Sequence, residues 1–274
     1  MTSEHTQQVG RLFDQVADDY DAVGVDFFGP MAARLVEELR PQPGERWLDI
    51  GCGRGAVLLR AAETVGADGE AVGTDISRGM LERCAERVSD AGLTNVRLIE
   101  DDAQAPAVDG AFDVVSSSAV VFFLPDPGAA LASWLRLAVP GGRLGILTFA
   151  ELDPRWQALD ALFRPYLPPD MLDARTTGAA GPFASDAGVE ELVSGAGWSD
   201  VRTVRDEVGV RFATPEHWLR FSMSTGQRRM WALVPEDERD AVAATAFEQL
   251  RADADADGST TYWQRYRLTL AARP

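Results

Sequence analysis

Three glycines at alternating positions, Gly51, Gly53 and Gly55, follow a short apolar segment that contains Asp49. Glycines let a loop turn sharply and let a ligand approach the backbone without interference from a Cβ atom. A helical pattern follows over residues 54–65, and the N-terminus of a helix offers unpaired N–H groups. The pattern predicts a strand, a tight turn and a helix that bind a small ligand. The alternative is a turn of the same shape that binds nothing.

A second acidic position lies at a spacing that suits a ribose. Asp75 ends the apolar segment 71–75 and follows Gly55 by 20 residues. A carboxylate about 20 residues after such a glycine loop can accept hydrogen bonds from both ribose hydroxyls. Asp75 or Ser77 can also cap the helix expected over residues 78–91, and the two roles are compatible.

A third acidic position, Asp102, follows the apolar segment 96–100. Acidic runs of this kind most often lie on a solvent-exposed surface. The residues that follow Asp102 give no further indication of chemistry on their own.

The elements that position these residues alternate between strands and helices. Such an alternation predicts βαβ units in a parallel sheet, with the carboxyl ends of the strands along one edge. In the second half the pattern predicts two or three helices over residues 214–250. The other expected helices are 6–23, 28–39, 54–65, 78–91, 128–138 and 186–196, and the expected strands are 46–50, 71–75, 96–100, 112–117, 143–149, 198–208 and 262–271.

Taken in order, these motifs resemble those of class I S-adenosylmethionine-dependent methyltransferases of the small-molecule type. The D-x-G-x-G-x-G pattern over residues 49–55 resembles their first motif, and Asp102-Ala103 and the Pro-Gly-Gly turn at residues 140–142 match later ones. Residues 12–21 resemble the entry helix of the ubiquinone and menaquinone methyltransferases. The resemblance is specific for the cofactor and the fold, and it says little about the substrate.

The resemblance implies an α/β, Rossmann-like sheet that is mostly parallel, with a final antiparallel strand beside strand five and with helical lid insertions. A single methyltransferase domain is expected over residues 1–274. Its parts are N-terminal helices (1–40), a cofactor-binding core (41–149) and two substrate-lid insertions (150–183 and 209–259).

The resemblance also implies S-adenosylmethionine as the cofactor and S-adenosylhomocysteine as its product. The glycine loop would lie behind the amino-acid part, Asp75 would bind the ribose and Asp102 the adenine amino group. The implied cofactor-binding residues are Asp49, Gly51, Cys52, Gly53, Asp75, Ile76, Met80, Asp102, Ala103 and Ser117.

Methyl transfer is an in-line displacement that needs alignment and exclusion of water, and it needs a general base only if the acceptor keeps its proton. His217 and Tyr20 are the candidate catalytic residues. The alternatives are helix capping or packing for His217 and core packing for Tyr20. Where many members of the family carry a histidine after strand four, this chain has Phe122-Phe123, which favours a hydrophobic acceptor or catalysis by proximity alone.

The predicted insertions are rich in aromatic side chains, which either line a substrate pocket or pack the lid helices together. We expect a small, apolar or aromatic acceptor such as a bacterial secondary metabolite, methylated on O, N or C. These aromatic residues are Trp156, Phe163, Tyr166, Phe183, Phe212, Trp218, Phe221 and Trp231.

The composition of the chain excludes several classes of partner and of chemistry. The 274 residues carry a net charge of −17, which argues against nucleic acid and anionic membranes as partners. All 26 basic residues are arginine, so a lysine base or Schiff base is excluded. No apolar run has the roughly 18–20 residues of a membrane span, and no signal peptide is evident, so a cytoplasmic location is expected. The N-terminal and lid helices are candidate surfaces for a homo-oligomer.

No metal site or disulfide is expected. Cys52 and Cys84 are the two cysteines, and a disulfide between them is not expected in the cytosol. Residues 253–258 match the opening of an EF-hand loop, but Gln264 stands where its final glutamate would fall.

Two rival functions share the fold. One is an NAD(P)-dependent oxidoreductase, against which the spacing of Gly55 and the Asp102-Ala103 match both count. The other is a protein that binds the methyltransferase cofactor but carries out a non-methylating reaction. Accumulation of S-adenosylhomocysteine during turnover distinguishes the second rival from a methyltransferase.

Overall fold

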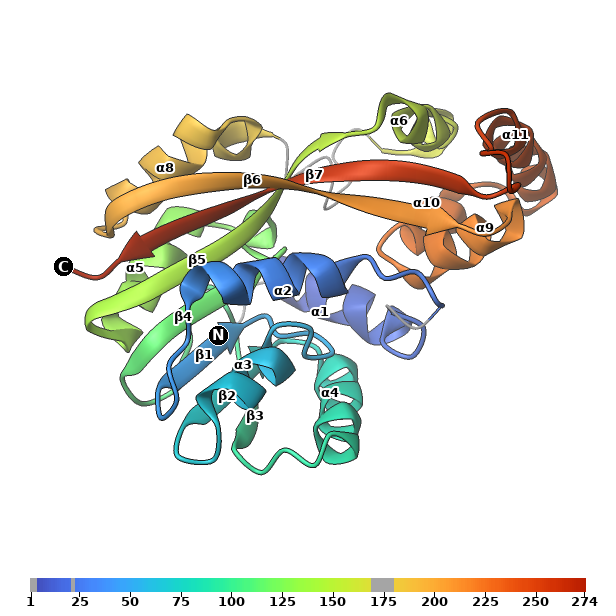
Figure 1. Cartoon of the computed structure of the whole chain (residues 1–274). Coiled ribbons are helices and arrows are strands. Elements are labelled where there is room, and N and C mark those ends of the chain that lie inside the picture. The colour runs from blue at the N-terminus through green and yellow to red at the C-terminus, as the bar shows by residue number, and fades with distance from the viewer. Residues whose placement is uncertain (1–3, 21–22, 169–179) are drawn as a thin grey trace.

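Seven strands form one sheet in the order β3-β2-β1-β4-β5-β7-β6 (Figure 1). The computed structural model describes residues 4–20, 23–168 and 180–274. Strands β1 to β5 are parallel, and β7 pairs antiparallel with both β5 and β6, which confirms the predicted antiparallel strand beside strand five. The strands are β1 (Arg46–Ile50), β2 (Glu70–Asp75), β3 (Val96–Glu100), β4 (Phe112–Ser118), β5 (Ala138–Leu152), β6 (Ser199–Phe212) and β7 (Thr260–Ala272).

Helices cover both faces of the sheet. Helices α2 and α3 pack together on one face and α5 and α8 on the other, while α9, α10 and α11 gather at one end of the long strands β6 and β7 (Figure 1). The α-helices are α1 (Glu4–Val16), α2 (Phe28–Leu39), α3 (Leu58–Val65), α4 (Arg78–Asp90), α5 (Pro127–Leu137), α6 (Pro154–Ala161), α8 (Asp186–Gly195), α9 (Pro215–Ser224), α10 (Arg228–Leu233) and α11 (Arg239–Ala252). Short 3-10 helices are η1 (Val121–Phe123), η2 (Arg164–Tyr166), η3 (Gly181–Ala184) and η4 (Glu236–Glu238).

Two predicted helices differ from the structure by more than one residue at an end. Helix α3 begins at Leu58 and not at residue 54, because Gly53 and Gly55 have φ angles of 52° and 83°, which no right-handed helix contains. Helix α1 ends at Val16 and is followed by a turn to Tyr20. Residues 21–22 of the helix predicted over 6–23 lie outside the described residues.

Both predicted insertions are partly sheet. Strand β5 continues to Leu152, and β6 continues to Phe212, where it still pairs with Thr260 of β7. The described helical parts of the insertions are therefore α6, η2 and η3 in the first and α9, α10, η4 and α11 in the second. Residues 169–179 of the first predicted insertion lie outside the described residues.

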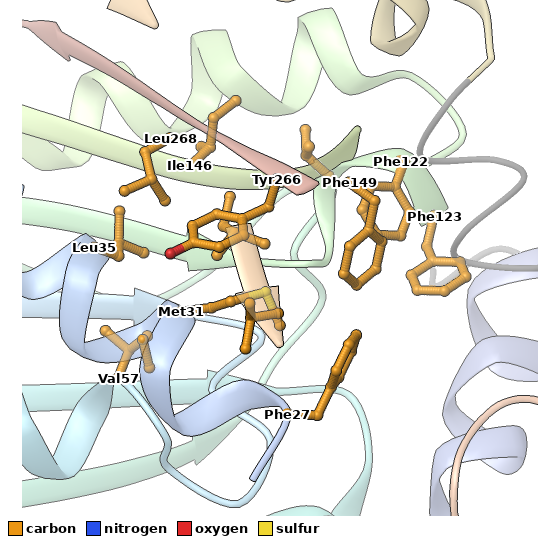
Figure 2. Packing of buried hydrophobic residues seen from close by; sticks show 14 of the residues in the cluster. Phe27, Met31, Leu35, Val57, Phe122, Phe123, Ile146, Phe149, Tyr266 and Leu268 are labelled. Carbon is orange, nitrogen blue, oxygen red and sulfur yellow. The ribbon is translucent and has the colours of Figure 1, made fainter. Parts of the chain in front are cut away.

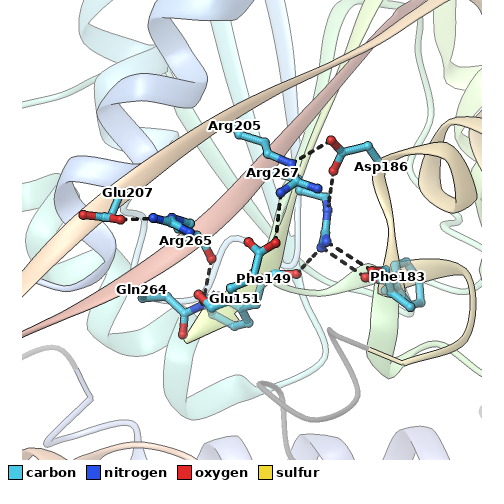
Figure 3. A network of polar contacts seen from close by, with 10 residues as sticks. Phe149, Glu151, Phe183, Asp186, Arg205, Glu207, Gln264, Arg265 and Arg267 are labelled. Atoms are coloured by element: carbon cyan, nitrogen blue, oxygen red, sulfur yellow. Dashed lines mark hydrogen bonds and ion pairs between the residues drawn. The ribbon is translucent and has the colours of Figure 1, made fainter. Parts of the chain in front are cut away.

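A buried arginine fixes the end of the first insertion to the sheet. Arg267 of β7 is 3% exposed, and its Nε donates to Asp186 Oδ1 over 2.6 Å. Its Nη1 donates to the carbonyl oxygens of Phe149 and Phe183, over 2.6 and 3.0 Å (Figure 3). Removing one partner of such a pair leaves a buried charge uncompensated, at a cost of about 3–5 kcal/mol. The network therefore holds η3, and with it Phe183, against the end of β5.

Candidate active site

A cavity of about 1050 Å³ opens at the carboxyl ends of β1, β2 and β4. Ligands of open α/β sheets bind at this edge. Nine of the ten residues predicted to bind the cofactor line this cavity, namely Asp49, Gly51, Cys52, Gly53, Asp75, Ile76, Met80, Asp102 and Ala103.

The glycine loop leaves room for a ligand. Gly51, Gly53 and Gly55 have φ angles of 71°, 52° and 83°, a region that other residues rarely adopt. A Cβ on Gly53 would meet no atom within 4 Å, whereas one on Gly51 would lie 2.3 Å from Val120 Cγ2. The loop therefore turns tightly against the protein and presents open backbone at Gly53.

Asp75 holds the glycine loop and also binds the residue that caps the next helix. Its Oδ2 accepts a hydrogen bond from the Gly53 N–H over 2.8 Å, and its Oδ1 accepts one from the Ser77 N–H over 2.9 Å. Ser77 is the N-cap of α4, because its Oγ accepts from the Met80 N–H. Burial raises the pKa of Asp75 to about 6, although the hydrogen bonds from Ser77 and Gly53 oppose this.

Asp49 is a buried acid at the end of β1. It is 1% exposed, and Ser116 Oγ donates to its Oδ1 over 2.7 Å. Burial raises the pKa of Asp49 to about 7, the hydrogen bond from Ser116 opposes this, and the negative charge of Asp75 adds to it. Two neighbouring acids whose charged forms are both disfavoured suit a ligand that brings positive charge or hydrogen-bond donors.

Both aspartates after β3, Asp101 and Asp102, line the cavity, and one of them also has a structural role. Asp101 Oδ2 accepts from the N–H groups of Ala107 and Val108, over 2.8 and 3.2 Å, and so folds the following turn. Asp102 Oδ1 accepts from the Gln104 N–H over 2.9 Å. No hydrogen bond among the described residues reaches Asp102 Oδ2, so this oxygen is available to a ligand.

Helix α1 covers the cavity. Asp14 Oδ1 accepts from Ser77 Oγ over 2.6 Å and from the Gly79 N–H over 3.0 Å, which holds α1 over the start of α4. His5 lies in the first turn of α1, and its Nε2 lies 2.8 Å from the Phe123 carbonyl oxygen. The residues of α1 that line the cavity are Thr6, Val9 and Phe13.

Ser117, which was predicted to bind the cofactor, does not line the cavity. Ser117 is fully buried, and its Oγ donates to the Ile50 carbonyl oxygen over 2.8 Å, so its side chain points between β4 and β1. Ser118 lines the cavity instead. Successive side chains of a strand point to opposite sides, so a shift of one position reverses the assignment.

A second cavity of about 690 Å³ adjoins the first. Its walls are mostly aromatic, and in Figure 2 the rings of Phe27, Phe149 and Phe123 point toward one another. Five residues line both cavities: Phe13, Tyr20, Phe28, Ala119 and Phe123. The remaining residues of the second cavity are Leu12, Phe27, Phe149, Trp156, Phe221, Thr225, Gly226 and Gln227.

Tyr20 lies at the boundary of the two cavities, where its ring stacks on Phe28 with centroids 5.1 Å apart and an interplanar angle of 21°. Phe123, which follows β4, also lines both cavities. Of the aromatic residues of the predicted insertions, Trp156 and Phe221 line the second cavity. Trp231 instead packs edge to face on Phe163, at 4.9 Å.

His217 lies in neither cavity. Its Nδ1 accepts from the Ala213 N–H over 3.2 Å, so Nε2 carries the proton and donates to the Val23 carbonyl oxygen over 2.9 Å. Both ring nitrogens thus have backbone partners at the start of α9. This geometry fits the packing and capping alternative, and the histidine is not placed to act as a base.

Two carboxylates of the EF-hand-like segment already bind side chains of the β6–β7 region. Asp253 Oδ2 accepts from the Tyr262 hydroxyl over 2.8 Å, and Asp257 Oδ2 accepts from Arg211 over 2.7 Å. Among the described residues no group of three or more histidine, cysteine, aspartate or glutamate side chains could hold a metal ion. Cys52 and Cys84 are buried free thiols, and the pKa of Cys52 lies well above its ordinary value because of its contact with Cys84 and its burial.

The strand order and the acid at the end of each of the first two strands define a Rossmann-like class I methyltransferase fold. Phosphoethanolamine N-methyltransferase 2 of Haemonchus contortus has this fold, with a TM-score of 0.61 and 18% identity. The match covers 100% of this chain and 61% of that longer chain.

The family described as "Methyltransferase domain" matches residues 41–188. Nocamycin O-methyltransferase of Saccharothrix syringae is 36% identical over 276 residues, which are 96% of this chain and 98% of that protein. Aklanonic acid methyltransferase of Streptomyces sp. (strain C5) is 41% identical over 172 residues, covering 62% and 78% of the two chains. Demethylmenaquinone methyltransferase of Listeria monocytogenes serotype 4a is 30% identical over 175 residues, covering 61% and 74%.

This chain therefore belongs to the methyltransferase-domain family and is an S-adenosylmethionine-dependent methyltransferase. Asp49, Asp75 and Asp102 and the open backbone at Gly53 suit the polar parts of that cofactor. In the described part of the chain, no helix is long and apolar enough to cross a membrane.

Proposed function

We propose that this enzyme transfers the methyl group of S-adenosylmethionine to an oxygen of a small, planar, apolar acceptor in the second cavity. The observation that carries the proposal is the set of five residues shared by the two cavities, which makes them neighbours. The name of the relative that is 36% identical, nocamycin O-methyltransferase, supports oxygen as the accepting atom and a secondary metabolite as the substrate class.

In this proposal the cofactor lies across the strand ends. Asp75 binds the ribose hydroxyls and Asp102 binds the adenine amino group through Oδ2. The backbone around Gly53 lies under the amino-acid part, whose ammonium group is favoured near Asp49. The support is the position of each group on the first cavity, with Asp49 and Asp75 in the last two residues of β1 and β2 and Asp102 just after β3.

When bound, the cofactor supplies a methyl group on a positively charged sulfur, which leaves as a neutral thioether. The chain contributes alignment and exclusion of water. Tyr20 and Phe123 present aromatic rings where the two cavities meet, and aromatic faces attract a cationic methyl group. We therefore assign Tyr20 to the wall of the site and assign no general base.

A variant that fills only the second cavity tests the proposal. Gly226 lines the second cavity but not the first, and a Cβ built on it meets no atom within 4 Å. We expect Gly226→Leu to bind S-adenosylhomocysteine within twofold of wild type and to raise the acceptor KM at least tenfold, measured as methylated product by mass spectrometry. Gly195→Leu on the exposed face of α8, where a Cβ also meets nothing, is the matched control.

An unchanged acceptor KM in Gly226→Leu would contradict the placement of the acceptor. Turnover of the acceptor without release of S-adenosylhomocysteine would favour the non-methylating alternative, and binding of NAD alone would favour the oxidoreductase. The net charge of −17 supports a small-molecule acceptor and no nucleic-acid partner. We also propose a cytoplasmic location, which cell fractionation tests. A homo-oligomer through the N-terminal or lid helices remains a proposal that light scattering tests.

A further inference from the structure

One buried amide interrupts the aromatic wall of the second cavity. Gln227, at the N-cap of α10, is 4% exposed and lines the cavity. Phe27, Phe149, Trp156 and Phe221 line the same cavity. Burying an amide among such rings is unfavourable unless its polar atoms find partners.

A carboxylate fixes the orientation of this amide. Gln227 Nε2 lies 2.7 Å from Asp160 Oδ1 of α6. A carboxylate oxygen can only accept, so the NH₂ group of Gln227 must face Asp160 and the carbonyl oxygen Oε1 must face elsewhere. The pair also joins α6 of the first insertion to α10 of the second.

The carbonyl oxygen of the Gln227 side chain can still accept a hydrogen bond. Within the described residues the side chain of Gln227 makes no hydrogen bond other than the one to Asp160, so Oε1 accepts none. Near it, the Thr225 hydroxyl already accepts from the Gln227 backbone N–H over 3.4 Å and lies 3.5 Å from the Ser222 carbonyl oxygen. An oriented, nine-tenths buried acceptor on an apolar cavity selects a ligand that carries a hydrogen-bond donor.

We propose that Gln227 determines acceptor specificity: its Oε1 accepts a hydrogen bond from a hydroxyl group on the planar acceptor, and Asp160 is the positioning residue that aims the amide. This inference rests on the proposed function, because it requires the acceptor to occupy the second cavity. The structural alternative is that Gln227 only links α6 to α10, in which case it would affect stability and leave ligand preference unchanged.

Two shape-matched probes separate these roles. We would titrate 2-hydroxyanthraquinone and 2-methylanthraquinone, each with saturating S-adenosylhomocysteine, and follow tryptophan fluorescence, since Trp156 lines the cavity. Wild type is expected to bind the hydroxyl probe about fivefold to tenfold tighter, as one buried neutral hydrogen bond allows. Gln227→Met keeps the length of the side chain without the amide and is expected to bind the methyl probe at least as tightly.

Two further variants complete the test. Asp160→Ala removes the orienting carboxylate and is expected to reduce the preference to about twofold. Gln249→Met is the matched control, because Gln249 Nε2 donates to the Arg155 carbonyl oxygen over 2.8 Å, outside both cavities, and its preference should equal that of wild type.

Three results would overturn the assignment: an unchanged hydroxyl preference in Gln227→Met, no preference in wild type, or no binding of either probe by wild type. Calorimetry with S-adenosylhomocysteine, run on each variant, shows whether the cofactor site is intact. If S-adenosylhomocysteine still binds and only the probe result differs from expectation, the role of Gln227 or the acceptor pocket is refuted. Loss of S-adenosylhomocysteine binding by wild type would refute the cofactor placement itself.

Discussion

The backbone N–H of Gly53 donates to Oδ2 of Asp75 over 2.8 Å, and this bond holds the glycine loop after β1 against the end of β2. The same carboxylate accepts from Ser77 at the start of α4. Asp75 therefore joins the end of β2, the loop after β1 and the start of α4. This loop lies beside the switch point of the sheet, since β2 and β4 pair with opposite edges of β1.

Replacing the buried acid of β1 should stabilise the empty enzyme. The pKa of Asp49 is about 7 in the folded chain against 3.8 in the unfolded one, so the unfolded state loses its proton first as the pH rises. Stability is therefore lost between about pH 4 and pH 7. We expect Asp49→Asn to be more stable than wild type at pH 8 by roughly 2–4 kcal/mol, since each pH unit between the two pKa values is worth about 1.4 kcal/mol.

Chemical denaturation at pH 5 and pH 8 measures this effect. The difference in the free energy of unfolding between Asp49→Asn and wild type should be smaller at pH 5 than at pH 8. In the variant, Ser116 can still donate its hydrogen bond to the amide oxygen of residue 49. The variant should also bind S-adenosylhomocysteine more weakly, because the charge that favours the ammonium group is gone. A variant that is less stable than wild type at pH 8 would contradict the pKa assigned to Asp49.

Cofactor binding should release protons below pH 7. The pKa values of Asp49 and Asp75 are about 7 and about 6, and a ligand that brings an ammonium group and hydroxyl donors favours their ionised forms. Affinity for S-adenosylhomocysteine should therefore weaken as the pH falls from 7 to 5. Calorimetry at pH 6 in two buffers of different ionisation enthalpy measures the protons released, and proton uptake on binding would be the opposite result.

His217 should prove to be structural. Its ring joins the Val23 carbonyl oxygen to the Ala213 N–H, and both bonds lie outside the cavities. We expect His217→Phe to lower the free energy of unfolding by about 1–3 kcal/mol for the two hydrogen bonds and to leave kcat within twofold. A fall in kcat of a hundredfold or more, with a changed pH profile and unchanged stability, would restore His217 as a base.

The lining of the first cavity could be predicted because its residues lie in short contiguous motifs at strand ends. Asp49, Asp75 and Asp102 each follow an apolar segment, and the parallel sheet brings those ends together. Ser117 was misplaced because strand alternation gives opposite answers for adjacent positions.

The lining of the second cavity could not be predicted in the same way. Phe27, Phe149, Trp156 and Gln227 come from separate segments and meet only through the packing of α6, α9 and α10 on the long strands. An isolated glutamine has no periodic or spacing signal. What the sequence did offer was the excess of aromatic residues in the insertions, and these both line the cavity and pack the helices.

The placement of the cofactor is tested most directly by calorimetric titration of S-adenosylhomocysteine into wild type and Asp75→Ala, with NAD titrated in parallel. We predict one-to-one micromolar binding to wild type and no binding of NAD. In the variant, affinity should fall at least a hundredfold while circular dichroism shows a folded chain, because two charge-assisted hydrogen bonds are worth about 3–6 kcal/mol. Equal affinity in the two proteins, or binding of NAD alone, would contradict the account.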